Sequence, residues 1–270
     1  MLEKITTIIN NCLYGYILVI LLVGAGLFFT AKTRFAQFRL FKGQIKAVTE
    51  KPTDGKGVSS FQALMVSTAS RVGTGNIIGV STAICLGGYG SIFWMWLIAI
   101  IGAASAFVES TLAQIYKKRG KDGSYGGPAY YIEKGIGSRK LAVLFSVFLI
   151  LTYGVGFNML ASFNLQSTFS AYKFYNAAYT PWIIGFVVAF FTLLCLLGGG
   201  KGIIKVTSFL VPIMGVLYIL VALAIVILNI SSLGSIMSVI FKSAFDFDAI
   251  FGGFSGSCVM YGIKRGFYEF

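Results

Sequence analysis

The sequence contains 270 residues, of which 57% are hydrophobic and only 11% are charged. A soluble domain carries about 25% charged residues, so this composition excludes a water-soluble protein and indicates an integral membrane protein. The formal net charge of +13 would suggest a nucleic-acid partner in a soluble protein, but here the basic residues follow a membrane pattern that is described below.

The first predicted element is an apolar run at residues 12–30, long enough to span a bilayer. A basic segment follows, in which Phe35, Phe38 and Phe41 recur at a spacing of three. This spacing predicts an amphipathic helix on the membrane surface. The later predicted membrane segments are, in chain order, 58–86, 91–116, a helix from 141 past 158, 181–197, 203–228 and a last glycine-rich segment at 247–267. We expect tight turns at the sequences GGYG and GGGKG.

Positive charge is concentrated in alternate loops. Eighteen of the 22 Lys and Arg residues lie after the first, third and fifth predicted helices and at the end of the last segment. Because basic loops remain on the cytoplasmic side, we expect the N-terminus to lie outside and these loops inside a multi-pass protein of the inner or plasma membrane. The same pattern accounts for the net charge without nucleic acid.

The second predicted membrane helix contains the unusual stretch ASRVGTGNIIG, Ala69 to Gly79. Its glycines, Gly73, Gly75 and Gly79, permit costly backbone dihedrals, so we expect the helix to unwind where it lines a cavity. The exposed carbonyls suit a cation such as sodium, and the exposed N–H groups suit a carboxylate. Thr74 and Asn76 add the side-chain oxygens that hard cations prefer. The alternative is close helix packing of small residues.

The last segment carries a second glycine-rich break, at Gly252, Gly253 and Gly256. By the charge pattern, this segment and the second helix enter the membrane from opposite sides. Two broken helices of opposite direction are typical of an inverted repeat. The pair therefore favours a binding site over simple packing and implies a small substrate with a carboxylate.

Two charges, Arg71 and Glu109, fall inside predicted membrane helices, which makes each a functional candidate. We expect Arg71 to order the unwound stretch or to gate the cavity, and Glu109 to have a structural or gating role. With no histidine in the chain, histidine-based catalytic and metal sites are excluded, and the glycine stretches do not have nucleotide-binding spacing. We therefore expect no enzyme, no catalytic residue and no resident metal. The four cysteines lack CxxC spacing and are predicted to be free, buried, small apolar residues: Cys12, Cys85, Cys195 and Cys258.

Several motifs follow one another in a fixed order between Ala69 and Gly137: VGTGN, GG, IFWMW, FVES and GGPAYYI. In this series the chain resembles the alanine or glycine:cation symporter family. The resemblance extends more weakly through LTYGVGFN, GGGKGIIKVTSFLVPIMGVLY, FKSAF and GIKRGF, and so through nearly the whole sequence.

The resemblance implies an all-α, leucine-transporter-like fold in which an inverted repeat follows one extra N-terminal helix. It also implies sodium-coupled, sometimes proton-coupled, uptake of alanine or glycine, with sodium as the coupling ion and no other cofactor. The expected parts are 1–57 with the extra helix and the basic segment, 58–230 with the first five-helix repeat, and 231–270 with the start of the second. The implied substrate contacts are Gly73, Thr74, Gly75, Asn76, Gln166, Gly252 and Gly253, with Thr74 and Asn76 also at the ion.

The chain departs from the family pattern at two points. The family usually has a glutamine where an ungapped comparison places Ala161; Gln166 comes later, and Asn158 or Asn164 could substitute for it. The family also continues with further helices after KRG, whereas this sequence stops at Phe270. We therefore expect this polypeptide alone not to transport and to need a C-terminal half. The alternative function is a membrane scaffold, or a regulatory or split-subunit partner derived from a transporter half. The sequence does not distinguish alanine from glycine as the substrate, or sodium from a proton as the coupling ion.

Overall fold

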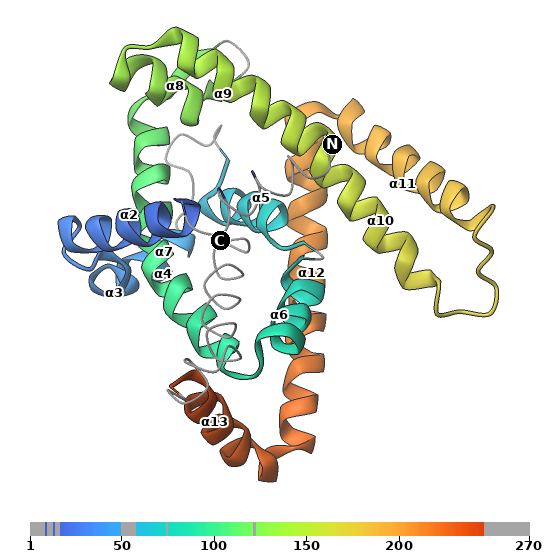
Figure 1. Ribbon diagram of the computed structural model, residues 1–270. Helices are drawn as coiled ribbons and strands as arrows, with labels where there is room; N and C mark the ends of the chain where they lie inside the picture. The colour runs from blue at the N-terminus through green and yellow to red at the C-terminus, as the bar shows by residue number, and fades with distance from the viewer. Residues whose placement is uncertain are drawn as a thin grey trace. The chain divides into compact units, whose positions relative to one another are not determined.

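The computed structural model describes residues 9, 13, 17–49, 58–73, 75–120 and 123–245, and this part of the chain is almost entirely helical (Figure 1). The chain forms two compact units, Met1–Ala104 with Cys195–Phe270 as the first and Ser105–Leu194 as the second. The predicted last segment, 247–267, lies outside the described residues.

The first unit brings the beginning and the later part of the chain together. The helix α5 starts with a capping box, in which the Ser59 hydroxyl accepts from the Gln62 N–H at 3.2 Å and the Gln62 side chain accepts from the Ser59 N–H at 3.1 Å. This helix packs along α12. The described elements of the unit are α2 (Leu18–Lys32), α3 (Ala36–Arg39), α4 (Phe41–Thr49), α5 (Ser60–Arg71), η2 (Gly75–Gly79), α6 (Val80–Gly87), most of α7 (Gly90–Ile115), α12 (Gly199–Leu228) and α13 (Ile230–Ala244).

The second unit begins within α7. A short antiparallel hairpin follows this helix, with Lys118 opposite Tyr125. The remaining elements, in order, are β1 (Lys118–Gly120), β2 (Gly123–Tyr125), α8 (Pro128–Tyr131), η3 (Ile132–Ile136), α9 (Arg139–Leu151), η4 (Thr152–Phe157), α10 (Asn158–Phe169) and α11 (Thr180–Leu197). The segments α9, η4 and α10 form one uninterrupted helix with a π-helical centre, as the sequence predicted for a long fourth helix.

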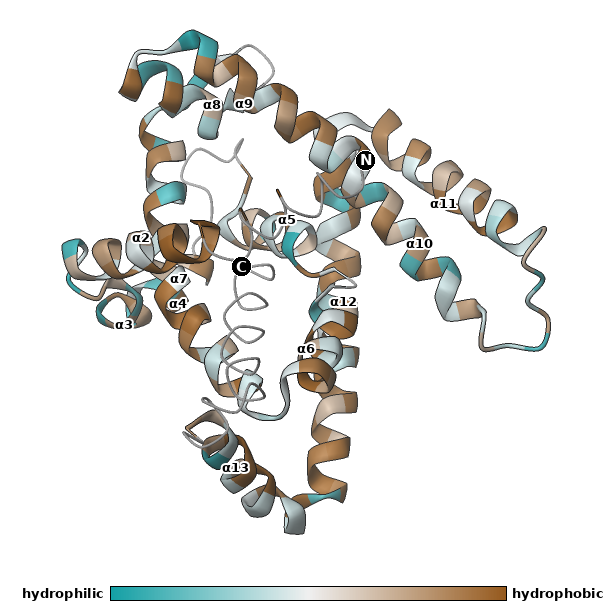
Figure 2. Cartoon of the chain, viewed as in Figure 1, coloured by the Kyte–Doolittle hydropathy of each residue, from teal (hydrophilic) through white to brown (hydrophobic). Residues whose placement is uncertain are grey.

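Four of the described helices are long and apolar enough to cross a membrane: Gly90–Ile115, Arg139–Phe169, Thr180–Leu197 and Gly199–Leu228. They confirm four of the predicted membrane segments. Many of their large apolar side chains point outward; Trp182 is 80% exposed and Leu228 is 82% exposed, and hydrophobic residues cover these helices in Figure 2. Such surfaces require lipid rather than water, so the chain is a multi-pass membrane protein.

Three local features differ from the sequence prediction, and the predicted burial of Cys85 is wrong because this cysteine is exposed. Phe35 takes a left-handed conformation (φ 56°, ψ 47°) that separates α3 from α2, and α3 ends at its C-cap Leu40 (φ −94°, ψ 7°). The basic segment therefore forms two short helices, α3 and α4, instead of one amphipathic helix. The side chains of Phe35, Phe38 and Phe41 are nevertheless all exposed. In GGGKG the turn is confined to Gly198 and to Gly199, whose φ is 57°, and α12 already contains the rest. The helix α13 was not predicted, because its serines and Gly234 weaken the apolar run.

Candidate functional site

The predicted break in the second membrane helix is present in the first unit. The helix α5 ends at Arg71, and Val72 has an extended conformation (φ −85°, ψ 101°) with its N–H bonded to the Thr68 carbonyl at 2.8 Å. The chain resumes as η2 at Gly75 and continues directly into α6. The stretch between Arg71 and Gly75 therefore separates two helical halves.

A reciprocal pair of hydrogen bonds closes this break. The Gly73 N–H donates to the Asn76 side-chain oxygen at 3.0 Å, and the Asn76 N–H donates to the Gly73 carbonyl at 3.2 Å. The Asn76 side chain is half-buried, whereas Gly73 is exposed. Because an amide oxygen has two lone pairs, the bond from Gly73 leaves Asn76 able to accept a second partner.

The two helical halves present opposite partial charges at the break. The last carbonyls of a helix lack intrahelical partners and carry partial negative charge, whereas the first N–H groups of a helix carry partial positive charge. Here α5 contributes a carboxyl end and η2 with α6 contributes an amino end. The arrangement can attract a cation at one end and a carboxylate at the other.

The glycines of this stretch differ in their surroundings. A Cβ placed on Gly73 would meet no heavy atom of the described residues within 4 Å, so no described helix packs closely against this glycine. Gly79 is buried and has ordinary helical dihedrals (φ −73°, ψ −33°), so the expectation of costly dihedrals is wrong at Gly79.

The other predicted contact residues are distributed over the chain. Gln166 lies on α10 in the second unit, half-buried, where its side-chain oxygen accepts from the Tyr175 hydroxyl at 2.8 Å. Asn158 donates to the Gly154 carbonyl at 3.1 Å. The remaining candidates lie outside the described residues and stay predictions: Thr74, Gly252, Gly253 and Gly256.

The two charges that were predicted to lie inside the membrane belong to different units. Arg71 is exposed at the end of α5 in the first unit, and Glu109 is exposed on α7 in the second. Glu109 influences Tyr131 of α8: burial raises the pKa of the Tyr131 hydroxyl, and the negative charge of Glu109 raises this pKa further. The motif residues FVES and GGPAYYI are thus electrostatically connected within one unit.

Three residues that the sequence patterns did not indicate as functional, Lys201, Lys205 and Ser208, line a cavity between α5 and α12 in the first unit. The spacing of the two lysines, four residues apart at the start of a membrane helix, is the signal that could have identified them, because it places both on one helix face.

Comparison with known proteins gives a consistent family. Residues 1–269 match the sodium:alanine symporter family. Over 267 residues the chain is 40% identical to the amino-acid carrier protein AlsT of Bacillus subtilis, covering 99% of this chain and 56% of that protein. It is 42% identical to the probable sodium/glutamine symporter GlnT of the same organism, with 99% and 56% covered. It is 38% identical to the sodium/alanine symporter AgcS of Methanococcus maripaludis, with 97% and 58% covered. The chain thus spans about half the length of the curated relatives it matches.

Proposed function

Because the chain belongs to the sodium:alanine symporter family, we propose that it forms part of a secondary active transporter that couples sodium to the uptake of a small neutral amino acid, alanine or glycine. This is a transport function rather than catalysis. The named relatives include an alanine and a glutamine symporter, so the family supports an amino-acid substrate more firmly than any particular one.

The observation that carries the proposal is the broken helix of the first unit. Between Arg71 and Gly75 the carboxyl end of one helical half approaches the amino end of the next, and the oxygen of Asn76 lies at the junction. A small amino acid with its coupling ion requires this pair of opposite partial charges, one for its carboxylate and one for the cation.

Individual residues receive proposed roles on this basis. Gly73, Thr74, Gly75 and Asn76 would contact the substrate, and Thr74 and Asn76 would also contact sodium through oxygen atoms, which this hard cation prefers. Further substrate contacts would come from Gln166, Gly252 and Gly253. Arg71 and Glu109 would order or gate the site rather than bind the amino acid.

The wider architecture belongs to the same proposal. We infer a leucine-transporter-like inverted repeat, with the extra helix in 1–57, the first repeat in 58–230 and the second repeat beginning in 231–270. The basic loops would be cytoplasmic and the N-terminus outside, in the inner or plasma membrane, because positive charge is retained on the cytoplasmic side.

Transport is tested by supplying the part of a relative that this chain does not match. Residues 1–269 are joined to the unmatched part of the sodium/alanine symporter AgcS, and the purified product is reconstituted into lipid vesicles. An inward sodium gradient should drive accumulation of labelled alanine, an equal potassium gradient should not, and excess unlabelled glycine should compete.

Two parallel samples make the result decisive. Intact AgcS in the same vesicles establishes that the assay detects transport. If AgcS accumulates alanine and the joined protein does not accumulate it under a sodium gradient, the proposal is wrong. The 270-residue chain alone is tested beside them. Alanine accumulation by this chain would exclude the scaffold or split-subunit alternative, which expects no transport without a partner.

A further inference from the structure

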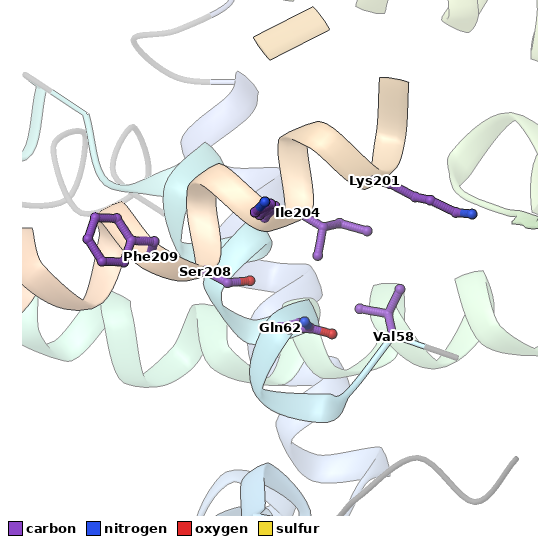
Figure 3. A pocket seen from close by; sticks show the side chains of 7 residues that line it. Val58, Gln62, Lys201, Ile204, Ser208 and Phe209 are labelled. Atoms are coloured by element: carbon purple, nitrogen blue, oxygen red, sulfur yellow. The ribbon is translucent and has the colours of Figure 1, made fainter. Parts of the chain in front are cut away.

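A cavity of about 480 Å³ lies between the beginning of α5 and the beginning of α12 in the first unit. We call it the α5–α12 cavity; Val58 and Gln62 line it from the α5 side, and Lys201, Ile204, Lys205, Ser208 and Phe209 line it from α12. Figure 3 shows the side chains of Gln62 and Ser208 in the space between the two helices, with Phe209 at one end and Lys201 at the other. The cavity is separate from the break at Gly73.

The positive charge at this cavity has no counterpart in the described part of the unit. Lys201 and Lys205 are both exposed and lie one helical turn apart on α12. Among the described residues of the first unit there is no Asp or Glu. The ion pair within the described ranges, Lys118 with Glu133 at 4.0 Å, belongs to the second unit. The described lining of the cavity therefore carries positive charge, which attracts an anion.

The remaining lining is apolar, which distinguishes between anions. Ile204 and Phe209 lie on the same helix as the lysines, and the Phe209 ring is 71% exposed. A free inorganic anion has no apolar group that could contact this lining, whereas a phospholipid has both a charged headgroup and apolar chains. The position also fits, because the lysines lie in the first two turns of the membrane-spanning Gly199–Leu228, where headgroups are found.

We propose that the α5–α12 cavity binds the phosphodiester headgroup of an anionic phospholipid. Lys201 and Lys205 neutralise the phosphate, and an acyl chain follows Phe209. Basic pockets between membrane helices are recognised sites for such headgroups. The site does not depend on the transport proposal.

The test measures which lipid remains with the purified chain. The 270-residue protein is reconstituted in vesicles of equal phosphatidylcholine and phosphatidylglycerol, extracted in neutral detergent, and its retained lipid is quantified by mass spectrometry. The unmodified chain should retain phosphatidylglycerol preferentially. The double variant Lys201→Gln/Lys205→Gln should retain roughly 10- to 30-fold less phosphatidylglycerol, because each lysine near a membrane surface contributes about 1 kcal/mol to the binding of anionic lipid.

A matched control is available on α4, where Lys42 and Lys46 are also four residues apart. The variant Lys42→Gln/Lys46→Gln removes the same charge and should change retention less than about twofold, while Lys201→Arg/Lys205→Arg should retain the lipid. Equal loss in both Gln variants, or no preference in the unmodified chain, would overturn the proposal. Excess inorganic phosphate should leave the lipid bound; displacement by phosphate would identify a free-anion site and overturn the lipid assignment.

Discussion

The indole N–H of Trp94 donates a hydrogen bond to the Ala244 carbonyl at 3.3 Å, although the two residues are 150 positions apart in the chain. At the same junction the Gly90 N–H donates to the Ser243 hydroxyl at 3.3 Å. The Phe93 ring lies 4.9 Å from that of Phe245, centre to centre, in an edge-to-face arrangement. The beginning of α7 and the end of α13 thus form one well-defined contact of the first unit.

Replacement of Gly90 by alanine should weaken this contact. A Cβ at Gly90 would lie 2.6 Å from the Ser243 carbonyl oxygen and 2.7 Å from the Ala244 nitrogen, and backbone atoms cannot rotate away. Gly90→Ala should therefore cost about 1–3 kcal/mol, seen as a Tm lower by several degrees in detergent. Gly24→Ala on α2 is the control, because a Cβ there meets no described atom within 4 Å; equal Tm values for the two variants would contradict the contact.

The sequence predicted the broken helix but not the α7–α13 contact, and the physical reason is the range of the interactions. The break between Arg71 and Gly75 depends on residues within one stretch of chain, where glycine and asparagine act locally. The pairing of Trp94 with Ala244 depends on which helices become neighbours. The sequence IFWMW does not indicate which distant helix will pack against it.

Gly26 tests the packing of α2 against α7. A Cβ at Gly26 would lie 2.6 Å from the Ile101 Cγ2 and 3.1 Å from the Ile101 carbonyl oxygen. Gly26→Ala should therefore lower the Tm by several degrees, through an overpacking cost of about 1–3 kcal/mol. The second substitution Ile101→Ala removes the closer atom and should recover part of the loss. A double variant no more stable than the sum of the two single changes would show that the residues do not interact.

Tyr131 gives a pH-dependent prediction. Burial, and next the charge of Glu109, raise the pKa of its hydroxyl above the ordinary value of 10.0, so the folded protein holds this proton more tightly than the unfolded chain. The contribution of Tyr131 to stability is complete below pH 10 and is lost as the pH rises through the raised pKa. Between about pH 9 and 11, the Tm of the unmodified chain should fall more steeply with rising pH than the Tm of Tyr131→Phe.

The Glu109 contribution can be separated from burial. Glu109→Gln removes the neighbouring negative charge, so the pKa of Tyr131 should fall toward its ordinary value. NMR titration of the chain with ring-labelled tyrosine measures this pKa, and the variant Tyr131→Phe identifies the signal of Tyr131. Glu133→Gln is the control, since Glu133 is closer in sequence but does not contribute to the shift. An identical titration curve for Glu109→Gln and the unmodified chain would refute the electrostatic connection.

The candidate site could be predicted only where its residues are consecutive. Gly73 and Asn76 are near neighbours in sequence, and their hydrogen bonds follow from a local turn. Gln166 is on an element of the second unit, with its oxygen bonded to Tyr175; nothing in the residues around it indicates that pairing. Contacts between distant helices depend on tertiary packing, to which single-sequence patterns are insensitive.

Asn76 separates the two interpretations of the glycine-rich stretch. If small residues are present for close packing, Asn76→Ala should be harmless and Asn76→Asp, which introduces a charge, should be harmful. If the oxygen of Asn76 closes the break and contacts a cation, Asn76→Ala should be harmful and Asn76→Asp should be harmless. Aspartate keeps an acceptor for the Gly73 N–H and adds negative charge that attracts sodium, whereas alanine removes the acceptor altogether.

We expect the second order, because a Cβ at Gly73 would meet no described atom within 4 Å and no described helix therefore packs against the stretch at that point. In the protein joined to the unmatched part of AgcS, Asn76→Ala should raise the sodium concentration for half-maximal alanine uptake by about 5- to 150-fold, the effect of losing about 1–3 kcal/mol. Asn76→Asp should keep or lower this concentration. Asn229→Ala, which removes a side-chain bond to the Ile225 carbonyl at 2.9 Å, should leave the sodium dependence unchanged. Normal sodium dependence in Asn76→Ala together with its loss in Asn76→Asp would return the stretch to a packing role.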